Sequence, residues 1–160
     1  MARELGPKDV AVRFTQADAL IAEAGMALYR ADKLLNSADF HGAIEAAQHS
    51  IEFAVKAILT FAAVDFRKMH EVSSQLEEAS RRICGLEQHE KEMLARLKWI
   101  SPMWSWANVT AVYGSIDVQA SRLFKWDDAT IAIQYAREGN NTAQTILSLV
   151  RHRDAKLLGS

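Results

Sequence analysis

Apolar side chains recur at steps of three and four residues along most of this 160-residue chain. This spacing places them on one face of a helix, and it constrains the fold more than any other feature does. The first such segment runs from about Asp9 to Leu35. Only 7 Gly and 2 Pro occur, which is too little punctuation for a turn-rich β architecture. We therefore expect an all-α fold, with one domain over residues 1–160 and its core over about 9–151.

A second helix is predicted directly after the first. Asn36 and Ser37 end the first segment, and Asp39 is a suitable N-cap because its carboxylate can accept amide hydrogens of the first turn. From there, apolar residues continue at helical spacing as far as Leu59. The short connection predicts an antiparallel hairpin of two helices.

The remaining segments predict further helices. A third helix is expected from about Glu71 to Ile83, with Gly85 as its breaker, and a fourth from about Glu87 to Trp99. We expect Ser101-Pro102 to end the fourth, because proline lacks the amide hydrogen that a helix interior needs.

The last helix is expected to begin near Asp127, with Asp127 or Asp128 as its cap. Apolar residues keep to one face across Gly139-Asn140-Asn141, which favours one continuous helix with a weak middle. The basic tail from Arg151 is expected to fray. Together the segments predict an up-and-down bundle of four to five helices.

Charge and cysteine content exclude several function classes. The net charge of −1 provides no general attraction for nucleic acid. A single cysteine, Cys84, cannot form an intrachain disulfide or a cysteine metal cluster. No segment has the length and apolarity of a signal core or a membrane span. The histidines lack metal-ligand spacing. We expect a cytoplasmic protein without a cofactor, a metal site or a membrane contact.

Several short motifs, in their order and spacing, resemble the HEPN domain family (higher eukaryotes and prokaryotes nucleotide-binding). The resemblance covers roughly residues 10 to 150. It rests on Ala38-Asp39-Phe40-His41-Gly42-Ala43, Ala47, Glu52, Lys56-Ala57-Ile58-Leu59, His70-Glu71-Val72, Leu76, Tyr113-Gly114 and the alanines from Ala129 to Ala136.

The resemblance implies a helical bundle that often dimerises, so we expect a homodimer. Many members of the family are metal-independent ribonucleases that use an Arg followed four to six residues later by a His. Others bind nucleotides or substrates, or act as partners of minimal nucleotidyltransferases. In this chain Val112 stands before Tyr113 where that Arg would be, and no His follows at the needed distance. Both the cation for the phosphate and the imidazole for proton transfer are missing there.

Three functional hypotheses follow. The leading one is a non-catalytic HEPN-like module that binds a nucleotide, RNA or a minimal nucleotidyltransferase partner. One form of this hypothesis places the module in a toxin–antitoxin pair. The second is a ribonuclease with a displaced site built from Arg82, His89 or His70. The third is a structural interaction domain that docks through the Trp-rich segment 99–106.

If a ligand site exists, we expect it at a mouth formed by Glu52, Lys56, His70 and Tyr113. Glu52 and Lys56 are spaced four residues apart, as an ion pair on one helix face is. Lys56 could contact a phosphate as a point charge. His70 is expected where a loop enters a helix, and Tyr113 just before a turn. The alternative is that all four are structural, with His70 fixing the loop.

Overall fold

The computed structural model describes residues 7–66, 72–113 and 120–158, and the side chains of 7–8, 103–113, 120–121 and 154–158 are outside the description. These residues contain no strand. Their helices are α1 (Pro7–Asn36), α2 (Phe40–Phe61), α3 (Val72–Arg82), α4 (Gln88–Tyr113), α5 (Ala120–Leu123) and α6 (Trp126–Leu158). The prediction of an all-α fold is therefore confirmed. None of the described helices combines the length and the apolarity that crossing a membrane requires.

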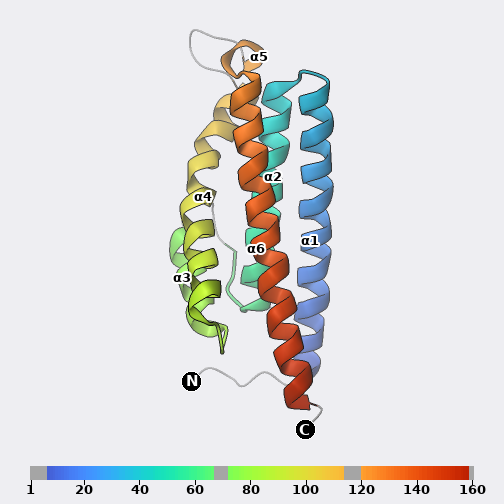
Figure 1. Cartoon of the computed structure of the whole chain (residues 1–160), viewed down its shortest axis with the longest axis vertical. Helices are drawn as coiled ribbons and strands as arrows, with labels where there is room; N and C mark the ends of the chain where they lie inside the picture. Colours follow the sequence, from blue (N-terminus) through green and yellow to red (C-terminus); the bar gives the residue numbers. More distant parts are fainter. Residues whose placement is uncertain (1–6, 67–71, 114–119, 159–160) are drawn as a thin grey trace.

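The four long helices lie along one axis, with α1 at one edge of the molecule (Figure 1). Helices α1 and α2 run in opposite directions, and so do α4 and α6. The short helix α3 packs beside α4. The arrangement agrees with the predicted up-and-down bundle, to which the chain adds the four-residue helix α5 that the sequence did not predict.

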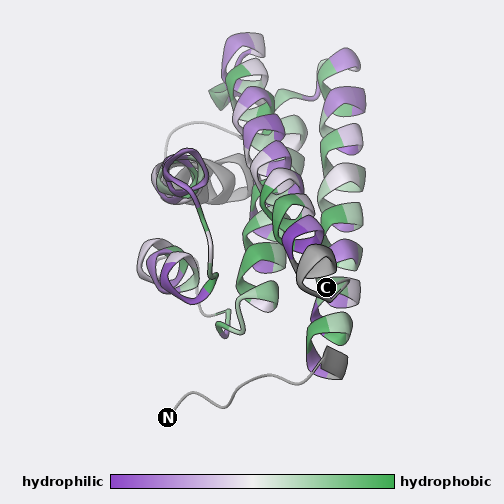
Figure 2. Cartoon of the chain, turned by 60° about the horizontal axis from the view of Figure 1, so that its bottom comes forward, coloured by the Kyte–Doolittle hydropathy of each residue, from purple (hydrophilic) through white to green (hydrophobic). Residues whose placement is uncertain are grey.

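Helix α2 is the centre of the bundle, because α1, α4 and α6 all pack against it. Twelve of its 22 residues are buried, and hydrophobic colour extends along much of it in Figure 2. Its start is fixed by Asp39, whose carboxylate accepts a 3.1 Å hydrogen bond from the Gly42 amide. The predicted N-cap is therefore confirmed.

Helix α6 continues without a break through Gly139, as the register of its apolar residues predicted. The reason is close packing. A Cβ atom at Gly139 would lie 3.3 Å from Leu97 Cδ1 of α4 and 3.9 Å from Ile51 Cγ1 of α2. Glycine therefore lets three helices approach one another at the middle of the bundle, and this packing offsets its low helix propensity.

The expectation that Ser101-Pro102 ends the fourth helix is wrong, since α4 continues to Tyr113 with Pro102 inside it. A proline in a helix leaves the carbonyl four residues earlier without its usual amide donor. Here that carbonyl belongs to Lys98, and it accepts a hydrogen bond of 3.4 Å from the Ser73 hydroxyl of α3. A tertiary contact thus replaces part of what the proline removes.

The expectation of a frayed tail from Arg151 is also wrong, because α6 continues to Leu158. Arg151 is 2.8 Å from both carboxylate oxygens of Asp18 on α1, and Arg153 binds residues at the start of α4. Helix α6 begins at Trp126, so Asp127 and Asp128 lie within its first turn and the expectation that one of them is the N-cap residue is wrong. Asp128 instead reaches back and accepts a 2.9 Å hydrogen bond from the amide of Lys125, the residue before the helix.

Replacing Gly139 by valine should destabilise the fold by about 1–3 kcal/mol, because the added methyl groups cannot fit against Leu97 and Ile51 without shifting them. Ser148→Val is the matched control, since Ser148 is an exposed residue of the same helix. The measurement is urea unfolding followed by circular dichroism. Equal stability of the two variants would contradict close packing at Gly139.

Candidate functional site

Glu52 and Lys56 form the ion pair that their spacing predicted. Lys56 Nζ lies 2.7 Å from Glu52 Oε1, and the two side chains are 29% and 26% exposed. The ammonium group also lies 4.6 Å from the centre of the Phe66 ring and 5.6 Å from that of Phe53. Lys56 is therefore held by a carboxylate and two aromatic rings, and binding a phosphate would compete with all three contacts.

The other two residues of the predicted mouth cannot be assessed in the same way. His70 lies outside the described residues. Tyr113 is the last residue of α4, and its side chain is outside the description, as are those of Trp104 and Trp106. The mouth of Glu52, Lys56, His70 and Tyr113 therefore stays a prediction beyond its first two members.

Arg82 and His89 do not share a site. The Arg82 guanidinium binds Glu78 and the Ala63 carbonyl, and it lines a polar recess between the end of α2 and α3. His89 lines a different groove, between α4 and α6. An Arg–His ribonuclease site needs both groups on one phosphate. The spacing of these two residues in the sequence does not produce that geometry.

An open groove between α4 and α6 has a volume of about 520 Å³. This volume lies in the range of small-molecule sites. Its lining combines cations, carboxylates and amides: His89, Glu92, Met93, Arg96, Gln134, Arg137, Glu138, Asn141 and Thr142. The groove thus offers both charges and hydrogen-bonding groups to a polar ligand.

Arg96 is fixed in this groove by a salt bridge and two rings. Its Nε donates to Glu138 Oε1 at 2.8 Å, and its guanidinium lies 4.9 Å from the centre of the Trp99 ring and 5.5 Å from that of Tyr135. The hydrogen bond to Glu138 is the main reason that the pKa of Arg96 is raised further above its usual range. Arg96 is therefore a permanent and oriented positive charge.

Two further features, one in the groove and one beside it, involve exposed groups. Arg137 Nη2 donates to both oxygens of Asp32 on α1, at 2.8 and 2.9 Å, so this guanidinium is also oriented. Trp99 remains 55% exposed one turn beyond Arg96, with the Tyr135 ring packed edge-on against it at 6.2 Å. A flat ligand could stack on such a ring.

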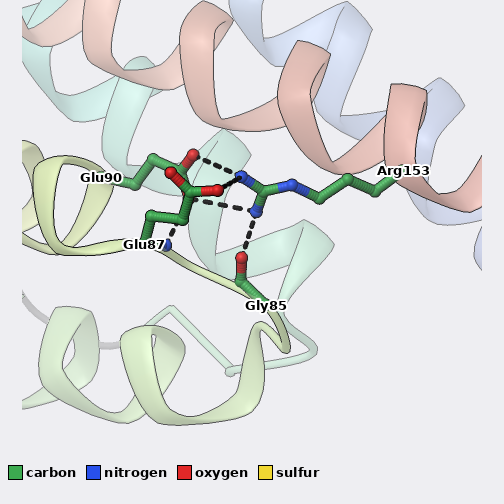
Figure 3. A network of polar contacts seen from close by, with 4 residues as sticks. All are labelled: Gly85, Glu87, Glu90 and Arg153. Carbon is green, nitrogen blue, oxygen red and sulfur yellow. Dashed lines mark hydrogen bonds and ion pairs between the residues drawn. The ribbon is translucent and has the colours of Figure 1, made fainter.

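At the start of α4, next to the groove residue His89, Glu90 and Arg153 form a buried contact between α4 and α6 (Figure 3). The two Arg153 terminal nitrogens lie 2.7 and 3.1 Å from the Glu90 carboxylate, whose side chain is only 5% exposed. Arg153 also donates to the Gly85 carbonyl, and Glu90 accepts a 2.8 Å hydrogen bond from the Glu87 amide. Glu90 therefore caps α4 while it anchors the end of α6.

Burial by itself would raise the pKa of Glu90, but the hydrogen bond and charge of Arg153 and the hydrogen bond from the Glu87 amide lower it below its usual value. The hydrogen bond to Glu90 likewise raises the pKa of Arg153. Both groups are therefore charged at neutral pH. They connect helices and do not form a group of titratable residues suited to proton transfer.

Two comparisons with known proteins bear on this site. A family model described as HEPN domain matches residues 17–152, which is most of the chain. No curated protein matches the sequence. The matched range contains every residue of the α4–α6 groove and the Glu52–Lys56 pair.

Arg153→Gln should lower the thermal unfolding midpoint more than Arg151→Gln does, because it leaves the buried Glu90 carboxylate without its cation. Arg151 is a matched control, because it lies on the same helix as Arg153 but pairs with an exposed carboxylate, that of Asp18 on α1.

The difference between these variants should also depend on pH. Because the pKa of Glu90 is lowered on folding, its contribution to stability is fully present above the pKa of the unfolded chain, about 4.3. This contribution is lost as the pH falls through the lower pKa of the folded protein. The difference in unfolding midpoint between the two variants should therefore become smaller in acid. A gap that is absent at pH 7, or that widens in acid, would contradict this account.

Proposed function

The chain belongs to the HEPN domain family, and from this we propose that it is a HEPN module without ribonuclease activity that binds a nucleotide, free or within RNA, in the groove between α4 and α6. The observation that carries the proposal is the pair of oriented arginines, Arg96 and Arg137, in one groove of about 520 Å³. Arg96 binds Glu138 through Nε and Arg137 binds Asp32 through Nη2, so other N–H groups of each guanidinium can donate to a phosphate. Guanidinium groups held in place before binding lose little freedom when they make this contact.

Groups in and beside the groove suit the rest of a nucleotide. Next to Arg96, the exposed Trp99 ring offers a surface on which a base can stack, and such stacking is worth about 1–3 kcal/mol per base in proteins that bind single strands. The amides of Gln134 and Asn141 can donate to or accept from base and ribose, and the carboxylate of Glu92 can accept from them. The mixed charges suit one nucleotide better than a long polyanion.

The absence of ribonuclease activity is proposed from the positions of Arg82 and His89. Arg82 is occupied by Glu78 and the Ala63 carbonyl, and His89 lines a groove to which Arg82 does not contribute. Within that groove His89 is accompanied by arginines that bind carboxylates. We propose that His89 contacts the ligand there and transfers no proton.

A second candidate function is the binding of a protein partner, such as a minimal nucleotidyltransferase in a toxin–antitoxin pair. The observation that favours it is the exposure of two large apolar side chains on α6, Trp126 at 55% and Ile131 at 45%. Exposed apolar residues of this kind often anchor protein interfaces. This candidate places the contact on α6 and requires no nucleotide in the groove.

In isothermal titration with ATP as the probe, Arg96→Ala and Arg137→Ala should each weaken binding about tenfold or more, because a hydrogen bond to a charged group is lost. Arg151→Ala is the control for Arg137, since both residues reach from α6 to an aspartate on α1 and only Arg137 lines the groove.

Binding that survives both groove substitutions but is lost in Lys56→Ala would move the site to the predicted mouth at Glu52 and Lys56. No ATP binding by the wild type at millimolar concentration would contradict the free-nucleotide form of the proposal. A short single-stranded RNA tested in parallel distinguishes that result from a need for RNA.

The wild-type protein should leave a single-stranded RNA intact during prolonged incubation with a metal chelator. Gel electrophoresis of a labelled RNA checks this directly. Cleavage that disappears in His89→Ala or His70→Ala would show a ribonuclease site and would overturn the non-catalytic proposal.

A further inference from the structure

The polar recess between the end of α2 and α3 contains a buried side chain that makes no hydrogen bond. Gln75 is only 5% exposed, and neither the oxygen nor the nitrogen of its carboxamide has a partner. Most buried polar groups in proteins are hydrogen-bonded, so an unpaired donor and an unpaired acceptor in one side chain require an explanation. Gln75 lines this recess, which we call the α2–α3 recess, and a ligand bound there could pair with both groups.

The walls of the α2–α3 recess are held together by contacts that do not involve Gln75. Ala63 follows the C-cap of α2 with a φ of 57°, in the left-handed region that glycine usually occupies at this position. Its carbonyl accepts a hydrogen bond from Arg82 of α3, which also binds Glu78 one turn earlier. The volume of the recess is about 260 Å³, half that of the α4–α6 groove, which suits a small ligand.

One free charge of each sign also lines the α2–α3 recess. Asp65 and Arg81 are exposed, and within the described part of the chain neither side chain has an ion pair or a hydrogen bond. The other two charged residues of the lining, Glu78 and Arg82, neutralise each other. The Asp65 carboxylate can accept hydrogen bonds from an ammonium group, and the Arg81 guanidinium can donate to a carboxylate. These two charges are therefore complementary to a zwitterion.

We propose that the α2–α3 recess binds a free amino acid with a carboxamide side chain, that is, glutamine or asparagine. The ammonium group of the ligand pairs with Asp65, and its carboxylate pairs with Arg81. Its carboxamide lies edge to edge with that of Gln75, and each carboxamide donates one N–H to the oxygen of the other. Because no hydrogen bond holds the Gln75 carboxamide, turning it toward the ligand breaks none.

The lining favours this class of ligand over others. A second carboxamide satisfies the donor and the acceptor of Gln75 at once, whereas a carboxylate offers no donor and an apolar group offers neither. A phosphate would meet the carboxylates of Asp65 and Glu78. No described residue lines both this recess and the α4–α6 groove, so the inference is independent of the proposed nucleotide site.

Isothermal titration of the full chain with glutamine and, separately, with asparagine tests the proposal. At least one of the two should bind saturably at millimolar concentration. Glutamate and aspartate are the matched probes, since each replaces the carboxamide by a carboxylate of nearly the same shape. Each should bind at least about tenfold more weakly than its amide, because it has no N–H to donate to Gln75. Saturable binding of neither amide, or equal binding of the acid form, would overturn the proposal.

Substitutions at the recess locate the site. Asp65→Asn and Arg81→Gln should each weaken binding of the amide about tenfold or more, because each removes one charge that pairs with the ligand. Arg30→Gln is the control for Arg81, since Arg30 is an exposed arginine of α1 that does not line the recess. It should bind as the wild type does. Both Asp65 and Arg81 are exposed, so these variants test the site without disturbing the core.

Gln75→Leu separates a binding role from a structural one. It should weaken binding about tenfold or more while the thermal unfolding midpoint stays equal or rises, because an unpaired buried amide is replaced by an apolar side chain of similar size. Gln48→Leu is the control, since Gln48 is also buried with an unpartnered oxygen but lies outside the recess. Unchanged binding in Gln75→Leu or in both charge variants, or binding lost equally in folded Gln48→Leu, would overturn the proposed site.

Discussion

The approach of α6 to α2 and α4 at Gly139 is the contact on which the rest of the bundle depends. Because Gly139 has no side chain, Leu97 and Ile51 can pack directly against the backbone of α6. Arg96 precedes Leu97 in the sequence, and Glu138 precedes Gly139. The salt bridge between Arg96 and Glu138 joins α4 to α6 beside this contact. The spacing that forms the core therefore also sets the width of the groove in which we propose that a nucleotide binds.

Arginines of α6 connect it to its neighbours along its length. Arg137 and Arg151 each reach an aspartate on α1, and Arg153 reaches Glu90 at the start of α4. The exposed pairs add little stability individually, but they orient their guanidinium groups, whereas the buried Glu90 contact is costly to break. In the groove this orientation supports the proposed binding of a nucleotide.

Local rules predicted much of the fold from the sequence. Asp39 capped α2, and the apolar register continued through Gly139, because both depend on residues only a few positions apart. Pro102 and the tail from Arg151 were misread because their outcome depends on distant partners, Ser73 and Asp18. The Glu52–Lys56 pair was predicted because its two residues are also close in the sequence, four positions apart on one helix. The α4–α6 groove was not predicted, since Arg96, Arg137 and Glu138 meet only once α4 and α6 are packed. The start of α4 near Glu87 was predicted, whereas the contact of Glu90 with Arg153 was not, because the two residues are 63 positions apart in the sequence.

We propose that an oriented pair of arginines between α4 and α6 binds a nucleotide. The most direct test is a titration of the ¹⁵N-labelled protein with ATP, followed by two-dimensional NMR of the backbone amides and arginine side chains. Binding in the groove should produce saturable shifts concentrated at residues 89–96 of α4 and 134–142 of α6, including the Arg96 and Arg137 side chains. Shifts concentrated around Glu52 and Lys56, or no saturable shifts at millimolar ATP, would contradict it.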